Sequence, residues 1–243
     1  MPETTETTIP VTNPGPDGSE MPVTLLRPES GHGAGIILVQ EIFGRSDYMR
    51  SRARDLADLG YTVVLPQIYW RVGQDVIDEG SPNALEVAMG VMQSIDWDLA
   101  VADVHDAVLW LRADEESEES VALVGFCFGG GLAYAAAQDA PRGGALPDAL
   151  VSYYSSALPQ LVDGPIVHVE SLHHFGDADA FIPADAVEHI REIVTEEGAE
   201  LHLWEGANHA FDNPSPELGF HDPRASREAW EVTVDWLAQH HPA

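Results

Sequence analysis

Short apolar segments alternate with longer helix-forming segments along most of the 243-residue chain. The apolar segments are rich in β-branched residues and end at glycine, proline or a polar residue, which is typical of buried strands. The helix-forming segments carry apolar residues three or four positions apart. Strands that alternate with helices in this way predict an α/β fold, with a mainly parallel sheet covered by helices on both faces. The expected strands span 23–26, 35–40, 61–65, 121–124, 149–153, 167–174 and 201–204, and the expected helices span 46–59, 98–112, 128–138, 183–197 and a last segment that starts at 222.

The first 20 residues differ from the rest because they are polar and contain several proline and glycine residues. We expect residues 1–20 to be a flexible lead-in that holds at most a short strand near 7–11. Residues 21–243 show no linker, repeat or low-complexity break, so one domain is expected there. No apolar run approaches the ~20 residues of a membrane helix, and the start has no signal-peptide pattern. The single cysteine excludes an internal disulfide and a cysteine-cluster metal site. We therefore expect a cytoplasmic protein.

The charge balance is strongly acidic, with 41 Asp and Glu against 11 basic residues and a net charge of −30. All of the basic residues are arginine. Such a chain should repel nucleic acid and anionic membranes. Scattered surface acids repel one another at low salt, and salt screens this repulsion, since the Debye length falls to ~3 Å at 1 M. The composition thus suggests a halophilic protein, although an ordinary acidic surface is the alternative.

The sequence Gly-Phe-Cys-Phe-Gly-Gly-Gly at 125–131 follows an expected strand and precedes an expected helix. It has the nucleophile-elbow pattern, G-x-nucleophile-x-G, with Cys127 in the place of serine. The sharp turn needs small residues two positions before and after the nucleophile, and glycine satisfies that need. The dipole of the following helix would favour a thiolate, and the amide of Phe128 would lie where an oxyanion develops. The alternative is a buried cysteine in a glycine-rich turn.

A catalytic triad on this scaffold needs an acid and then a histidine after the nucleophile in chain order. Asp177 and Asp179 follow the strand expected at 167–174, and both fit a loop at a strand end. His209 follows the strand expected at 201–204 and is the candidate base, one of 11 histidines in the chain. Glu41 follows the strand expected at 35–40, where a carboxylate would lie close to the nucleophile. Taken alone, Glu41 is better interpreted as a solvated loop acid.

Together these motifs resemble the dienelactone hydrolase family of the α/β-hydrolase superfamily. The resemblance extends from about residue 25 to about residue 237, and its four blocks are 40–44 (QEIFG), 125–130 (GFCFGG), 179–183 (DAFIP) and 208–211 (NHAF). It implies an α/β-hydrolase fold and a triad of Cys127, His209 and Asp179, and it selects Asp179 over Asp177 because the family's acid precedes an x-Phe-[Val/Ile]-Pro stretch. It also implies oxyanion amides from Ile42 and Phe128. In the family, the carboxylate at the position of Glu41 is thought to receive the cysteine proton when substrate arrives.

The substrate site departs from the family pattern. The family's prototype holds a substrate carboxylate with two arginines, one in the helical segment before the long central helix and one shortly after the histidine. Residues 82–96 and 210–223 contain no arginine here, and the negative charge of Asp212 would disfavour an anion. We therefore expect a neutral ester, lactone or thioester as substrate. The expected contacts to this substrate are Tyr69, Trp70, Arg71 and Asn213, with an apolar pocket wall or plain core packing as the two interpretations of the segment 67–74.

These observations predict a carboxylic ester hydrolase with a cysteine nucleophile, which acts on a small-molecule ester or lactone. No metal site is expected, because His173 and His174 would face opposite ways on a strand, and no cofactor motif is present. A monomer or small homo-oligomer is expected. The rival interpretation is a non-catalytic or redox-sensing relative, in which Cys127 is a reactive thiol without acyl turnover.

Overall fold

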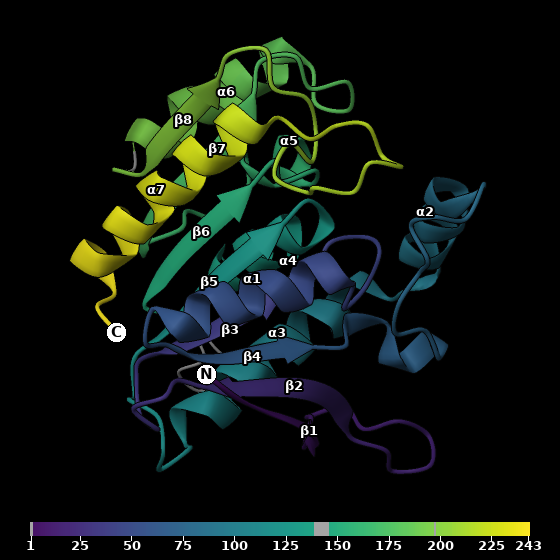
Figure 1. Ribbon diagram of the computed structural model, residues 1–243, viewed down its shortest axis with the longest axis vertical. Helices are drawn as coiled ribbons and strands as arrows, with labels where there is room; N and C mark the ends of the chain where they lie inside the picture. The colour runs from purple at the N-terminus through teal and green to yellow at the C-terminus, as the bar shows by residue number, and fades with distance from the viewer. Residues whose placement is uncertain (1, 139–145, 197) are drawn as a thin grey trace.

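The computed structural model describes residues 2–138, 146–196 and 198–243. Its centre is an eight-stranded sheet with the strand order β1-β2-β4-β3-β5-β6-β7-β8 (Figure 1). The strands from β4 to β8 along this order are parallel, while β1 and β2 are antiparallel to their neighbours. The strands are β1 (Glu3–Ile9), β2 (Met21–Arg27), β3 (Gly35–Val39), β4 (Thr62–Pro66), β5 (Val121–Phe126), β6 (Ala149–Tyr153), β7 (Glu170–Gly176) and β8 (Glu200–Trp204).

Helices cover both faces of this sheet, as the alternating pattern predicts. In Figure 1, α1 and α7 lie in front of the sheet and α3 and α4 lie behind it, whereas α2 stands apart, on the side to which the parallel strands point. The helices are α1 (Asp47–Asp58), the 3-10 helix η1 (Ile68–Val72), α2 (Ala84–Ser94), α3 (Trp97–Arg112), α4 (Phe128–Gln138), α5 (Leu158–Leu161), α6 (Ala184–Glu196) and α7 (Pro223–His240). Residue 197, the expected last residue of the helix at α6, lies outside the described residues.

Capping residues set the ends of two of these helices. The Ser46 hydroxyl accepts a hydrogen bond from the amide of Met49 and so caps α1. The Asp222 carboxylate accepts bonds from the amides of Arg224 and Ala225, and Pro223 occupies the first helical position of α7. Both start signals could be read in the sequence, and both helices begin within one residue of the expected positions.

The N-terminal segment contains a longer strand than the short one that the sequence suggests near residues 7–11. Residues 3–9 form β1, which pairs along its whole length with β2. The Glu6 carboxylate anchors this strand, because it accepts hydrogen bonds from Arg45 and Arg50 at 2.9 and 2.8 Å. The amide of Thr12 donates to Asp106 at 2.6 Å and ties down the segment that follows. These ionic and polar contacts to distant residues order a segment that has little apolar surface of its own.

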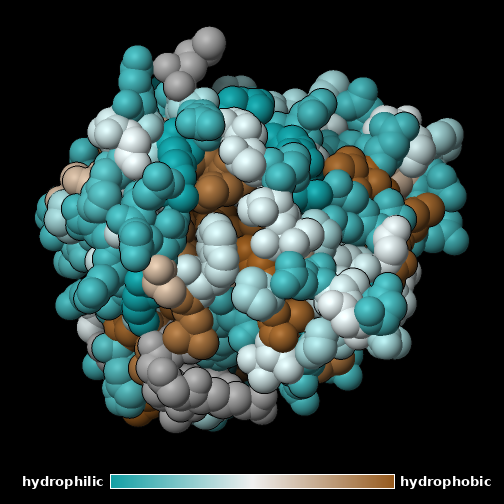
Figure 2. All heavy atoms as spheres, turned by 90° about the horizontal axis from the view of Figure 1, so that it is seen from below, coloured by the Kyte–Doolittle hydropathy of each residue, from teal (hydrophilic) through white to brown (hydrophobic). Residues whose placement is uncertain are grey.

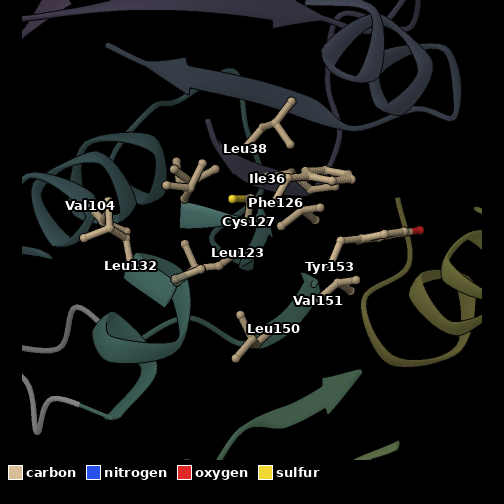
Figure 3. Packing of buried hydrophobic residues seen from close by; sticks show 14 of the residues in the cluster. Ile36, Leu38, Val104, Leu123, Phe126, Cys127, Leu132, Leu150, Val151 and Tyr153 are labelled. Atoms are coloured by element: carbon tan, nitrogen blue, oxygen red, sulfur yellow. The ribbon is translucent and has the colours of Figure 1, made fainter. Parts of the chain in front are cut away.

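The core lies between the central strands and the helices on either face. β3 and β5 are buried at every residue, because parallel strands in this position are covered on both sides. Figure 3 shows Ile36 and Leu38 of β3 close to Phe126, with Cys127 directly after it in the middle of the buried cluster. The Tyr153 ring stacks on Phe126 with 4.5 Å between ring centroids. The nucleophile candidate therefore directly follows a strand that is buried at every residue.

The face of the molecule drawn in Figure 2 is largely hydrophilic. Hydrophilic residues cover most of the face in Figure 2, and hydrophobic residues show between them in separate patches. Within the described residues, no helix has both the length and the apolar character needed to cross a membrane.

Candidate active site

Cys127 lies in the sharp turn between β5 and α4, as the elbow pattern predicts. Its backbone φ is +52°, in the left-handed region that is unfavourable for a side-chain-bearing residue. A Cβ atom on Gly125 would lie 2.4 Å from the carbonyl oxygen of Gly129, and a Cβ on Gly129 would lie 2.3 Å from that of Gln40. Positions 125 and 129 therefore both require glycine, because neighbouring backbone atoms leave no room for a side chain there. The amide of Cys127 donates to the carbonyl of Tyr153 at 3.0 Å and fixes the turn to β6.

His209 and Asp179 meet Cys127 at the carboxyl edge of the sheet. His209, in the loop after β8, has its Nε2 atom 3.1 Å from the Cys127 Sγ atom. Its Nδ1 atom lies 2.8 Å from the Oδ2 atom of Asp179. Asp179 belongs to the loop that follows β7. The other carboxylate oxygen of Asp179 accepts the amides of Phe181 and Ile182 at 2.8 and 3.0 Å, so the carboxylate is held on both sides. The three side chains have the connectivity of a nucleophile, base and orienting acid.

Asp177, the other acid that the strand-end rule allows, has a structural contact instead. Its Oδ1 atom accepts a hydrogen bond from the amide of Gly206 at 2.6 Å and so links the loops after β7 and β8. Asn208 belongs to the block 208–211 of the family resemblance, but its role was not anticipated: its side-chain oxygen accepts hydrogen bonds from the amides of Ala180 and His209 at 2.9 and 2.7 Å. Asn208 therefore sets the spacing between the loop of Asp179 and the loop of His209.

The charges around His209 favour its protonated form. Burial alone lowers the pKa of this imidazole, but the negative Cys127 sulfur and the hydrogen bond to Asp179 outweigh burial and raise the pKa to about 10. The Tyr154 ring packs 5.2 Å from the imidazole, and the backbone of Tyr154 also has a positive φ, of +36°. A strained backbone of this kind persists only where the surrounding structure fixes it. The strained residue Tyr154 packs directly against the imidazole of His209.

Glu41 is buried beside this cluster, with 1% of its surface exposed. Its Oε1 atom accepts a hydrogen bond from the Asn213 side-chain nitrogen at 2.8 Å. Burial raises the pKa of Glu41 well above its ordinary value, and the negative charges of Glu79 and Cys127 raise the pKa further. Asn213, expected to contact substrate, holds Glu41 in this structure.

Tyr69 contacts both Ile42 and Phe128, the two residues whose amides are expected to bind the oxyanion. Phe128 is the first residue of α4, where a backbone N–H has no intrahelical acceptor. Tyr69 donates its hydroxyl to the carbonyl of Ile42 at 3.2 Å, and its ring lies 5.7 Å from the ring of Phe128. Tyr69 therefore contacts both residues from the core side, while its own pKa is raised by burial.

A cavity of about 120 Å³ opens beside the Cys127 sulfur. Most of its wall is apolar, and no arginine occurs among the described residues that line it. The lining residues are Glu41, Ile42, Phe43, Leu85, Met89, Met92, Cys127, Ser156, Phe181, His209, Ala210, Leu218 and Phe220. The contribution of α2 was not anticipated, although the spacing of Leu85, Met89 and Met92 places them on one helical face and is visible in the sequence.

The segment expected to contact substrate is placed elsewhere. Arg71 donates to the Asp103 carboxylate at 2.6 Å and stacks on the Trp70 ring, whose own nitrogen donates to Asp103 at 2.8 Å. Tyr69, Trp70 and Arg71 are absent from the described lining of the cavity beside Cys127. Of the two interpretations of the segment 67–74, these contacts favour core packing over a pocket wall, because a buried carboxylate on α3 holds the arginine and the indole.

Asp212 also differs from expectation, since it does not present a negative charge to substrate. Its side chain is buried, and Arg52 donates to both of its oxygens at 2.8 and 2.6 Å. The hydroxyls of Tyr48 and Ser226 donate to it as well. This neutralised cluster holds the start of α7 against α1 rather than selecting substrates.

Within the described part of the chain, no group of three or more His, Cys, Asp or Glu side chains is arranged to hold a metal ion. His173 and His174 are buried and bond different partners: the His173 Nδ1 atom lies 2.8 Å from the Ser152 hydroxyl, and the His174 Nε2 atom lies 3.0 Å from the Thr233 hydroxyl. Burial lowers the pKa of His173 to about 4, so its imidazole stays neutral.

The mainly parallel sheet, the strained turn after β5 and the loops after β7 and β8 define the α/β-hydrolase fold. The profile of the dienelactone hydrolase family matches residues 21–241. This chain belongs to the dienelactone hydrolase family and is a dienelactone hydrolase-like ester hydrolase.

Known proteins resemble the chain over most of its length. A carboxymethylenebutenolidase of Pseudomonas putida is 32% identical over 206 residues, which cover 82% of this chain and 84% of that protein. Two solved structures share the fold: a dienelactone hydrolase-like promiscuous phosphotriesterase from metagenomic libraries, at TM-score 0.74 and 21% identity over 98% of both chains, and Thermogutta terrifontis esterase 2 phosphorylated by paraoxon, at TM-score 0.70 and 16% identity over 100% of this chain and 96% of that one.

Proposed function

We propose that the protein hydrolyses neutral carboxylic esters or lactones with Cys127 as nucleophile, His209 as base and Asp179 as the acid that orients His209. One observation carries this proposal: the His209 ring lies 3.1 Å from the Cys127 sulfur and 2.8 Å from an Asp179 oxygen, beside an apolar cavity. A buried cysteine without function needs neither an imidazole within reach nor an open cavity.

In the first step, the Cys127 thiol proton moves to the Nε2 atom of His209. The sulfur attacks the carbonyl carbon of the ester, and a carbon–sulfur bond forms while the carbonyl electron pair moves to oxygen. The amides of Ile42 and Phe128 donate to this oxyanion. When the intermediate collapses, the carbon–oxygen bond of the ester breaks, and the alkoxide leaves with the proton from His209, so that a thioester remains on Cys127.

In the second step, water hydrolyses this thioester. His209 takes a proton from the water molecule, and the resulting hydroxide attacks the thioester carbon. The carbon–sulfur bond then breaks, the sulfur regains the proton through His209, and the carboxylic acid is released. Asp179 keeps the Nδ1 proton of His209 in place throughout, which leaves Nε2 free to exchange protons with sulfur, leaving group and water.

Glu41 has a separate role in this proposal, as a carboxyl group that holds a proton beside the thiolate. A carboxylate and a thiolate side by side in a buried site repel each other, so formation of the thiolate favours a neutral Glu41. The Asn213 side chain keeps the Glu41 carboxyl turned toward the site. Glu41 therefore holds a proton of its own, separate from the one that Cys127 gives to His209, whereas the family resemblance implies that the cysteine proton reaches this carboxylate.

A neutral substrate follows from the charges near the cavity. The described lining carries no arginine that could pair with a substrate carboxylate, and the whole chain has a net charge of −30. An anionic substrate would have to approach against this field and leave its charge unpaired in an apolar cavity.

Turnover of 4-nitrophenyl butanoate and of a dienelactone carboxylate at high salt, by the wild type and by Cys127→Ala and Cys127→Ser variants, tests this function. We expect the wild type to prefer the neutral ester, Cys127→Ala to lose turnover, and Cys127→Ser to keep the fold with a strongly altered rate. Full activity of Cys127→Ala would refute the mechanism, and preference for the dienelactone would refute the neutral substrate. Labelling of the wild-type thiol by iodoacetamide without any ester turnover would instead support the redox-sensing alternative.

A further inference from the structure

The cavity beside Cys127 has one wall that belongs to neither helical layer of the fold. Leu85, Met89 and Met92 of α2 line it, at spacings of four and three residues that place them on one side of the helix. The fully buried residues of α2 are Ala84 and Ala88, whereas Met89 and Met92 are partly buried, so they contact the core and also line the cavity. Figure 1 shows α2 apart from the helices that cover the sheet.

Another part of the lining is aromatic and touches the imidazole of His209. The Phe181 ring lies 5.1 Å from the His209 ring and 6.0 Å from the Phe220 ring, both edge-on. Phe181 is nevertheless 50% exposed, and Leu85, which lines the same cavity, is 39% exposed. Large apolar side chains at the mouth of a cavity that contains the reactive sulfur are typical of a ligand-binding surface rather than of a sealed core.

The volume of the cavity limits what can fill it. A dry apolar protein cavity of ~150 Å³ accommodates a benzene molecule, so by proportion the 120 Å³ found here accommodates about five carbon atoms. Met89 and Met92 are unbranched and flexible, and such side chains adjust to the shape of an apolar ligand.

We propose that this cavity is an acyl subsite for a short, uncharged hydrocarbon chain, and that Met89 and Met92 of α2 set the chain length it accepts. The inference rests on the proposed function, because the acyl group must be attached to the Cys127 sulfur while it occupies the cavity. The preferred substrates are then neutral esters or lactones whose acyl part carries about five carbons beyond the carbonyl. In an ester the alcohol part leaves in the first step and needs no place in the cavity, whereas in a lactone it stays attached to the acyl chain as a hydroxyl group after the ring opens.

The test compares two ester series at high salt. One series has a constant 4-nitrophenol leaving group and straight acyl chains from acetyl to decanoyl, and the other has a constant acetyl group and alcohols of increasing size. For the wild type we expect kcat/KM to rise about fourfold per methylene in the acyl series, the fold-change equivalent to about 0.8 kcal/mol, and to stop rising near hexanoyl. The alcohol series should show no such dependence on apolar size.

Met89→Ala and Met92→Ala enlarge the cavity by three side-chain atoms each, so the break in the acyl series should move two or three carbons toward longer chains. Met89→Trp should move it toward acetyl. Val87→Ala is the matched control, because Val87 is 40% exposed on the same helix and is not part of the described cavity lining, and its acyl profile should match the wild type. Thermal unfolding of each variant is measured beside the wild type, and similar Tm values would show that the substitutions in α2 leave the fold intact.

Three results would overturn the subsite while leaving the proposed function in place. These are a wild-type acyl profile without a break, a break that neither methionine variant moves, and a shift that appears in the alcohol series instead of the acyl series. Loss of all ester turnover by the wild type would instead refute the proposed function itself, which Cys127→Ala tests separately.

Discussion

Replacing Glu41 with glutamine should stabilise the protein by an amount that grows with pH. Glu41 is buried, and its pKa is raised well above the ordinary 4.5, so the folded protein binds a proton at this site that the unfolded chain has already released. The stability that this proton contributes is fully present below pH 4.5, and it is lost as the pH rises from 4.5 toward the higher pKa of the folded state. Glutamine resembles the neutral acid in shape, keeps an acceptor for Asn213 and does not titrate.

The size of the effect follows from this linkage. Each pH unit inside the window changes the difference in unfolding free energy between Glu41→Gln and wild type by about 1.4 kcal/mol. For a chain of this length, that corresponds to a Tm difference that widens by about 3–6 °C per pH unit. The pair should therefore have similar Tm values near pH 4.5 and clearly different values at pH 6.

The assay is unfolding of both proteins at constant high salt, by heat and by urea, in steps of half a pH unit from 4.5 upward. Glu192→Gln is the matched control, because Glu192 is exposed on α6, and its Tm difference from wild type should not widen with pH. A constant offset between Glu41→Gln and wild type across the whole range would show that Glu41 does not hold a proton in the folded protein.

Three further predictions concern the site, its support and the surface. Asp179→Asn should lower kcat by about 10⁴-fold because it leaves His209 in the wrong tautomer, whereas Asp177→Asn should stay near wild type; equal losses in ester assays would contradict the assignment of Asp179. Arg52→Met should lower the unfolding free energy by about 3–5 kcal/mol in urea titrations, because the buried Asp212 carboxylate loses its cation, and adding Asp212→Asn should recover part of the loss. Raising KCl from low concentration to about 1 M should raise the Tm, because salt screens the repulsion among 41 acidic side chains, and an unchanged Tm across that series would remove the halophilic interpretation.

Much of the fold and of the candidate site could be predicted because the signals are local. The buried β-branched segments give the central strands, and the start signals at Ser46 and Asp222 give two helices. The glycines at 125 and 129 are needed wherever a nucleophile sits in a tight strand-to-helix turn. Parallel strands present their carboxyl ends at one edge, so the residues after β7 and β8 were expected near Cys127 before any coordinates.

The errors have a common physical origin, which is pairing between residues far apart in the chain. β1 is polar and lacks a strand pattern, and it is ordered by pairing with β2 and by arginines on and before α1. Arg71 and Trp70 were expected at the pocket, but Asp103, 32 and 33 positions away, holds them elsewhere. Asp212 was expected to place a negative charge near the substrate, but Arg52, 160 positions away, pairs with its carboxylate.

The central strands, most of the helices that cover them and the elbow at Cys127 could be predicted from the sequence, because hydrophobic period and turn chemistry act over a few neighbouring residues. The same rules indicated Cys127 and His209 but left Asp177 and Asp179 open, and the family resemblance selects Asp179. The tertiary structure decided which acids are paired, which arginines are occupied and that α2 forms a wall of the cavity. Burial and ion pairing depend on which residues from distant parts of the chain come within a few ångströms of each other. Short-range sequence patterns do not contain this information.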